Sequence, residues 1–193
     1  MKILRVTCCL FILLLSLVAF AFIAVHPAVA QGLNPPPPPG ATCQTTGQGT
    51  ICQGSDTFSD VNLDTGLSCG SFQILQSDTV TARFTLFYDQ AGNVTQAVFH
   101  DRAQGTFSNS VTGQSVPFEG TVTETLTFAT PGDFSTVTTT YTGDVFKVTL
   151  PGSGLILHDV GRAVFAPDGT ITFEAGPHQL LHGEVQKLCA ALS

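Results

Sequence analysis

The chain contains no tryptophan, only two tyrosines and one methionine, and charged residues make up only 11% of its 193 residues. Flat tryptophan and tyrosine rings are common platforms in sugar-binding proteins, so their scarcity counts against a lectin. Lysine and arginine total seven against 14 acidic residues, which gives a formal net charge of −7 with no basic stripe to offset it. Such a surface repels phosphate backbones, and nucleic acid is therefore excluded as a partner.

Motifs that would name a reaction or a metal are also missing. The chain has no Gly-x-Ser-x-Gly nucleophile motif, no His-Glu-x-x-His zinc motif and no tight Cys-x-x-Cys spacing. His178 and His182 are spaced for one helical face, but Gly183 disfavours a regular helix there. Residues 60–66 resemble the opening of a calcium loop, but Ser71 stands where the bidentate glutamate should be. We therefore expect no metal site and no cofactor.

What is present begins with an export signal. Lys2 and Arg5 precede an uncharged apolar run over residues 6–25, and Ala28 to Ala30 ends it with a small-x-small site. These features define a signal peptide over residues 1–30, so we expect cleavage after Ala30 and a secreted, extracellular protein. An apolar run of this length would also fit an uncleaved membrane anchor, and that alternative stays open. Cleavage removes both leader cations, and we expect no membrane association afterwards.

Five consecutive prolines follow the leader, from Pro35 to Pro39. Such a run adopts an extended polyproline conformation, so residues 31–41 are expected to form a spacer. The remaining residues, 42–193, are enough for one domain with its own core.

Four cysteines lie after the leader: Cys43, Cys52, Cys69 and Cys189. An even number in an exported chain predicts two disulfides, and the pairing stays open among three connectivities. Because Cys189 is almost terminal and the others lie near the start of the domain, at least one bridge should tie the tail to the N-terminal region.

From Ser71 onward, threonine, valine and phenylalanine alternate with period two between short turn sequences. This pattern predicts an all-β fold, an antiparallel meander of about eight strands, with separate strands at 94–101 and 106–107 and at 134–142 and 144–150. Since no crossover helices are indicated, the sheet must hide its edges, with a closed barrel as the first choice and a sandwich as the second. Apolar residues at helical spacing over 181–192 predict a short C-terminal helix packed across one end of the sheet.

Glu124 is the first candidate for a functional residue. On the expected strand from Phe118 to Phe128 it shares its face with apolar residues and one glycine, so it should point inward. A carboxylate on an apolar face is costly unless it is paired or lines a cavity. We expect Glu124 to act as a polar anchor for a ligand, together with Tyr141. A bulge that shifts the register, or neutralisation by an arginine, would be the structural alternatives.

His158 and Arg162 are further candidates for ligand binding, because they share one face of a strand. Adjacent strand residues point to opposite faces, so His158 cannot pair locally with Asp159. Outward-facing hydrophilic pairs would explain the same pattern.

Several segments carry a resemblance to known proteins: 43–47, 49–52, the turn at 88–93, 161–165 and 173–178. In their order the chain resembles a family of small secreted bacterial β-proteins of unknown function, which implies a bacterial source and no activity. Its expected architecture is also similar to the eight-stranded barrels of the allene oxide cyclase, dirigent and lipocalin kinds, which bind or rearrange apolar molecules inside. That second likeness rests on architecture alone.

Three hypotheses for function follow. The leading one is a secreted β-barrel that binds a small apolar molecule in a phenylalanine-lined interior. A cofactor-free cyclase or isomerase on the same scaffold would use Glu124 or a histidine as acid or base. A structural or adhesive surface module would instead have a solid core. The residues do not indicate an oligomeric state.

Overall fold

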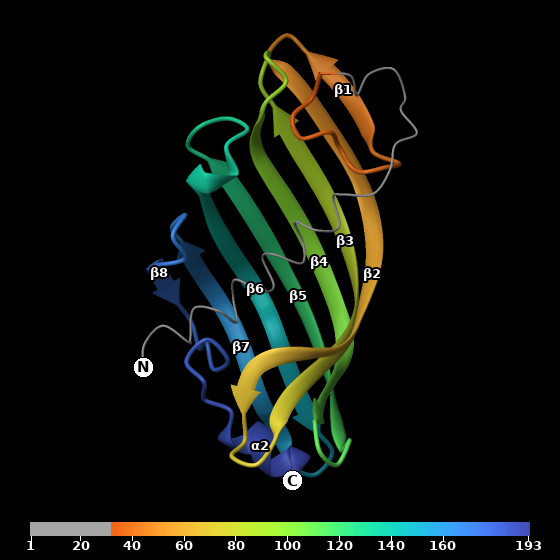
Figure 1. The fold of residues 1–193 in the computed structure, drawn as a ribbon, viewed down its shortest axis with the longest axis vertical. Coiled ribbons are helices and arrows are strands. Elements are labelled where there is room, and N and C mark those ends of the chain that lie inside the picture. Colours follow the sequence, from red (N-terminus) through yellow and green to blue (C-terminus); the bar gives the residue numbers. More distant parts are fainter. Residues whose placement is uncertain (1–31) are drawn as a thin grey trace.

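The computed structural model describes residues 32–193, so the expected signal peptide lies outside the described residues. The elements are β1 (Thr42–Thr46), β2 (Gly49–Ser68), β3 (Gln73–Tyr88), β4 (Val94–Asn109), β5 (Ser115–Phe128), the 3-10 turn η2 (Phe134–Thr136), β6 (Val137–Leu150), β7 (Gly154–Phe165), β8 (Ile171–Ala175) and α2 (Gln186–Leu192). The strands form one antiparallel sheet in chain order, with α2 at its lower end (Figure 1). The all-β meander and the C-terminal helix are thereby confirmed.

The eight strands are not the eight that the alternation predicts. The segments expected at 94–101 and 106–107 are one strand, β4, and those expected on either side of Gly143 merge into β6. Two further strands, β1 and β2, come from the region before Ser71. In β6 the break in the pattern is a register shift between residues 144 and 146 rather than a turn, so the strand continues through it.

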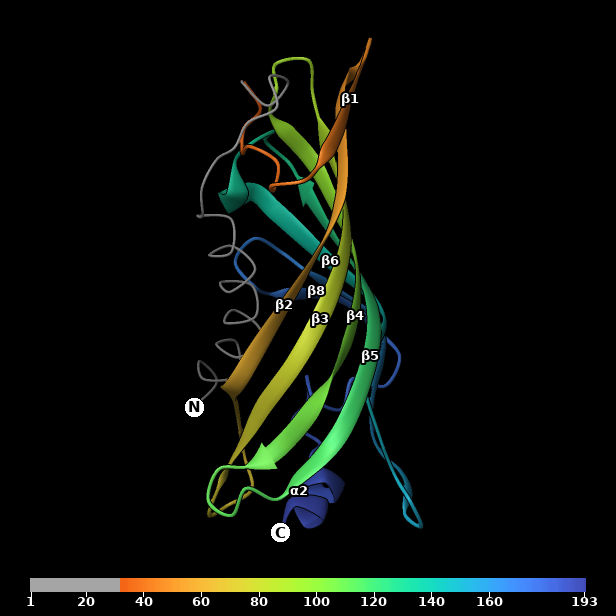
Figure 2. The ribbon, with the colours of Figure 1, turned by 90° about the vertical axis from the view of Figure 1, so that its right-hand side faces the viewer.

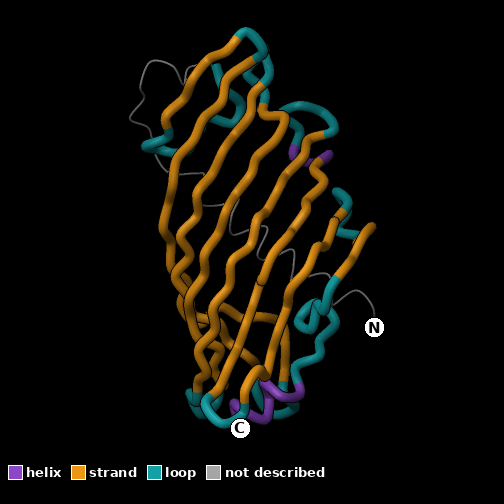
Figure 3. Tube along the Cα trace, turned by 180° about the vertical axis from the view of Figure 1, so that it is seen from behind, coloured by secondary structure: helices purple, strands orange, loops and turns teal. Residues whose placement is uncertain are grey.

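Hydrogen bonds do not close the sheet within the described residues. β1 pairs only with β2 and β8 only with β7, and all strands belong to the same sheet, so a two-sheet sandwich does not form there. Seen from the side, the sheet curves strongly around one face (Figure 2). We call this the concave face, and the opposite one, seen from behind in Figure 3, the convex face.

Glycines on neighbouring strands allow the sheet to bend. Gly143 and Gly161 are direct partners across β6 and β7, with φ values of 133° and 140°, which L side chains rarely adopt. A Cβ atom on Gly120 would lie 2.2 Å from the Val145 carbonyl oxygen, and one on Gly161 would lie 2.0 Å from that of Ala175. Neighbouring backbones therefore approach each other so closely at these glycines that no larger residue would fit.

The concave face carries a hydrophobic cluster toward each end. The lower cluster is built on Phe107 and Phe118, whose rings stack with centroids 4.6 Å apart, and α2 adds Leu188 and Leu192 to it. The upper cluster comprises Cys52, Phe84, Leu86, Tyr88, Val94, Ala97 and Phe128. Burial of α2 against the lower cluster explains why seven residues hold a helix that would be unstable alone.

Two disulfides are present, as expected. Cys43–Cys52 joins directly opposite residues of β1 and β2. Cys69–Cys189 spans 120 residues and fastens α2 to the segment that follows β2. The second bridge confirms that the tail is tied to the N-terminal part of the domain.

The proline-rich segment is attached to the upper end of the sheet. Asn34 forms a bridge with Asn93, and its N–H donates to the Gly92 carbonyl at 2.7 Å. The Tyr88 hydroxyl donates to the Pro35 carbonyl at 3.0 Å, and Leu33 packs against the upper cluster. The start of the expected spacer therefore belongs to the folded unit.

Candidate functional site

Glu124 and Tyr141 meet on the concave face. The register of β5 and β6 sets them directly opposite each other, and the Tyr141 hydroxyl donates to Glu124 Oε1 at 2.8 Å. The Glu124 side chain is only 9% exposed. The register shift between these strands lies at residues 119–121, so it does not turn Glu124 outward.

Burial dominates the electrostatics of Glu124. It raises the pKa of this carboxyl to about 7, the hydrogen bond from Tyr141 opposes the shift, and the charge of Asp101 adds to it. Asp101 lies on β4, two residues beyond Phe99, the direct partner of Glu124. Its own burial raises the pKa of Asp101 to about 6, against the effect of His100. Two neighbouring acids thus keep their protons to a higher pH than exposed carboxyl groups do.

No salt bridge neutralises these acids within residues 32–193, although the charge of His100 lowers the pKa of Asp101. The ion pairs there involve neither Glu124 nor Asp101. The strand register places Arg83, Arg102 and Arg162 on the convex face. The alternative that an arginine neutralises Glu124 therefore does not apply.

A second pair of acids lies lower on the concave face. Asp60 and Asp78 are direct partners across β2 and β3. Asp78 is 9% exposed, and its Oδ2 atom accepts from Gln76 Nε2 at 2.6 Å. The Oδ1 atom has no hydrogen-bond partner in the described part of the chain. Burial raises the pKa of Asp78, the Gln76 hydrogen bond lowers it, and the charge of Asp60 raises it further.

The segment that resembles a calcium loop does not form one. Asp60 faces the concave side from β2, whereas Asp64 accepts a hydrogen bond from the Gly66 N–H at 2.8 Å in a local turn. Among the described residues, no group of three or more histidine, cysteine, aspartate or glutamate side chains is arranged to hold a metal ion.

Small residues separate the two hydrophobic clusters on the concave face. Register places them on the same side of the sheet as Glu124: Ala82, Ala103, Gly120, Gly143 and Ala163. Register also places Val80, Phe99 and Val122 on this part of the face, so the acids stand among small and large apolar side chains. This arrangement combines an apolar floor with a few placed polar groups, as ligand sites do.

His158 and Arg162 lie on the convex face and do not join Glu124 and Tyr141. His158 Nε2 is 3.4 Å from Asp144 Oδ2, with both side chains one third exposed. The Arg162 guanidinium lies 5.4 Å from the centroid of the Phe173 ring. The four expected ligand-binding residues are thus divided between two faces.

Sequence reasoning missed a buried histidine and aspartate pair below the candidate site. His178 Nδ1 is 3.1 Å from Asp159 Oδ1, and the side chains are 4% and 6% exposed. Asp159 Oδ2 also accepts from the N–H groups of Leu180 and Leu181, at 2.8 and 3.3 Å. These bonds hold the chain after β8 against β7, which indicates a structural role.

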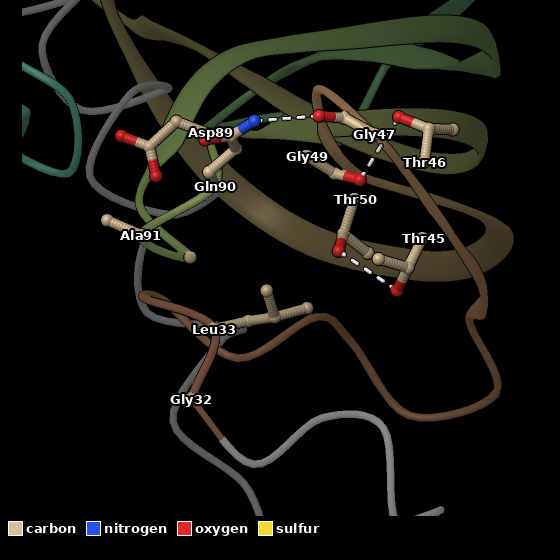
Figure 4. A pocket seen from close by; sticks show the side chains of 11 residues that line it. Gly32, Leu33, Thr45, Thr46, Gly47, Gly49, Thr50, Asp89, Gln90 and Ala91 are labelled. Atoms are coloured by element: carbon tan, nitrogen blue, oxygen red, sulfur yellow. Dashed lines mark hydrogen bonds between the residues drawn. The ribbon is translucent and has the colours of Figure 1, made fainter.

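Two surface pockets lie at the ends of the sheet rather than over Glu124. The upper one lies between the β1–β2 turn, the β3–β4 turn and Leu33 (Figure 4). Gln90 Nε2 donates across it to the Gly47 carbonyl at 2.7 Å. The lower one is lined mainly by serine and threonine residues of β3, β4 and the turn after β4. Neither brings together a set of titratable groups.

Comparison with known proteins identifies no relative: no protein-family model matches the chain, and no curated protein or solved structure matches it. Within residues 32–193, no helix has both the length and the apolar character needed to cross a bilayer. The two disulfides are of a kind typical of extracellular proteins.

The buried Glu124 predicts that stability falls as pH rises. Its pKa is about 7 in the folded protein against 4.5 for the exposed group, so the folded state keeps a proton that the unfolded state releases. The free energy of unfolding should therefore decrease between about pH 4 and pH 8, by roughly 3 kcal/mol from this group. In Glu124→Gln that part of the pH dependence should vanish, as measured by urea unfolding across the range.

Glu119→Gln provides the matched control for this measurement. Glu119 lies on the same strand but on the convex face, where it is exposed and pairs with Lys147 at 3.3 Å. This variant should keep the pH profile of the wild type. Identical profiles for wild type and Glu124→Gln would show that Glu124 is solvated in solution.

Proposed function

We propose that this protein is exported from the cell and binds a small, largely apolar molecule on the concave face of its sheet, which would act as the interior of a barrel does. Glu124 and Tyr141 would orient the polar end of the ligand. The observation that carries the proposal is the buried Glu124, hydrogen-bonded to Tyr141 at 2.8 Å and set among small and aromatic side chains. A buried carboxylate without a counter-charge lowers stability, so its presence is understandable if it serves binding.

Two features support the location. The pattern of residues 1–30 is typical of signal peptides, and the two disulfides fit an oxidising compartment. The low positive charge of the chain also fits a ligand other than nucleic acid.

Native mass spectrometry tests whether a ligand is bound. The protein, in the form that its host cell produces, should show an added mass under native conditions that is lost on denaturation. Once that molecule is identified, Glu124→Gln should weaken its binding by about tenfold or more, because a hydrogen bond to a charged group is lost. Glu119→Gln should bind as the wild type does. Equal binding by both variants would contradict the role of Glu124.

The raised pKa of Glu124, about 7, favours an enzyme as the second candidate. A general acid or base works best when its pKa is close to the operating pH, so the same residue could move a proton in a cofactor-free cyclisation or isomerisation. In that case Glu124→Gln would abolish turnover, whereas a pure binding role would only weaken binding. A structural module with a solid core is less well supported, because Ala82, Ala103 and Gly120 stand where large core side chains would be needed.

A further inference from the structure

Charge is divided between the two faces of the sheet. On β2 to β5, the charged groups whose register places them on the concave face are all carboxylates: Asp56, Asp60, Asp78, Asp101 and Glu124. On β7 and β8 the same face carries Asp159 and Glu174, which are paired with His178 and His182. The lysine and arginine residues of the described strands lie on the convex face instead: Arg83, Arg102, Lys147 and Arg162. The concave face therefore attracts positive charge and repels negative charge.

Three of these acids have no counter-ion in the described part of the chain. Asp78 is nine-tenths buried, and its Oδ1 atom has no hydrogen-bond partner there. Asp101 Oδ1 is likewise buried without a partner, and Glu124 is bonded only through Oε1 to the Tyr141 hydroxyl among the interactions described. A buried carboxylate is costly until a cation or a hydrogen-bond donor reaches it. The oxygen atoms that lack a donor thus belong to residues of the concave face, where a bound ligand would supply the donors.

We propose that the ligand of the concave face is an amphipathic organic cation, such as a protonated amine on an apolar body, with its charge between Asp101 and Glu124. This assignment rests on the proposed binding function and adds the chemical class of the ligand. The ammonium group would supply the donor that Asp101 Oδ1 lacks. The apolar body would lie on Phe99 and the small residues beside it.

Binding of such a cation should strengthen as pH rises. The titratable groups nearest Glu124 are Tyr141 from β6 and Asp101 from β4, and the charge of His100, on the convex face, acts on Asp101. Burial raises the pKa of Glu124 to about 7 and that of Asp101 to about 6, so both acids are largely protonated at pH 5 and largely ionised at pH 8. An alkylammonium ion keeps its charge throughout this range, so it meets two carboxylates at pH 8 and mostly neutral acids at pH 5.

Three probes with the same chain separate the ligand classes: n-decylamine, n-decanol and decanoate, each below its micelle concentration. In calorimetric titrations of the purified protein at pH 8, n-decylamine should bind at least tenfold more tightly than n-decanol, and decanoate more weakly than both. The preference for the amine should shrink at pH 5. Equal binding of the amine and the alcohol would overturn the cationic assignment but leave the proposed binding function standing. Failure of all three probes to bind would contradict both.

Two variants locate the charge of the ligand. Asp101→Asn keeps the size of the side chain and removes one carboxylate, so it should lower the affinity for n-decylamine tenfold while leaving that for n-decanol unchanged. Glu119→Gln removes a carboxylate from the convex face and should change neither affinity. If Asp101→Asn does not alter amine binding, or if Glu119→Gln alters it equally, the attraction is a general effect of net charge and the proposed site is wrong.

Discussion

Replacing Cys69 and Cys189 together by serine should lower the free energy of unfolding by about 5 kcal/mol. The bridge joins residues 120 positions apart, and in the chain-entropy model the stabilisation grows with the length of the loop that a disulfide closes. The loss also releases α2, whose seven residues depend on Leu188 and Leu192 in the lower cluster. Denaturant unfolding of the oxidised wild type and of the double variant measures the difference.

The Cys43–Cys52 bridge is the matched control for that experiment. It closes a loop of only nine positions between paired strands, so its double serine variant should lose about 3 kcal/mol. Because β1 and β2 still pair on both sides of these cysteines, the lower cluster should remain intact. Equal losses in the two double variants would contradict the dependence on loop length.

The orientation of Glu124 was predictable because β5 alternates without interruption. From Phe118 to Phe128 every second residue faces the concave side, and the register shift falls in the pairing with β6 rather than in the alternation of β5 itself. The inward orientation of Asp101 was not predicted, because Gly105, four residues further on the same face, has no side chain to continue the apolar pattern. The strand therefore seemed to end at Asp101, whereas β4 continues to Asn109.

The face on which His158 and Arg162 lie could not be read from the sequence. Both faces of β7 mix apolar and polar residues, since Asp159 stands on the buried side and Val160 on the other. The buried Asp159 is stabilised by His178, 19 residues later, and by the Leu180 and Leu181 N–H groups, which all belong to the chain that returns after β8. Such a contact depends on tertiary structure and leaves no local pattern.

The curvature of the sheet was also beyond the sequence pattern. Period-two alternation predicts which residues share a face, but not how sharply neighbouring strands bend. That depends on close backbone approaches at Gly120, Gly143 and Gly161, whose positions relative to one another are fixed by strand register. The same alternation was absent from β2, where exposed polar residues at the edge of the sheet hide the strand.

Asp159→Asn should destabilise the protein by about 4 kcal/mol, because it removes the carboxylate that contacts the buried His178 ring and accepts from two backbone N–H groups. Both ring nitrogens of His178 face oxygen atoms, Asp159 Oδ1 at 3.1 Å and the Ala175 carbonyl at 3.2 Å, so the buried ring depends on both contacts. The asparagine amide would in addition bring N–H donors toward the Leu180 N–H, which now donates to Oδ2 at 2.8 Å. Denaturant unfolding measures the loss.

The neighbouring pair on the convex face gives the matched control. Asp144 and His158 also combine an aspartate with a histidine, but both side chains are one third exposed, so Asp144→Asn should cost less than about 1 kcal/mol. Hydrogen exchange distinguishes a local from a general effect: the Leu180 and Leu181 amides should lose protection in Asp159→Asn and keep it in Asp144→Asn. If these amides stay protected when Asp159 is replaced, the carboxylate does not hold the C-terminal segment. In that case the Cys69–Cys189 bridge and the burial of α2 would be sufficient to hold it.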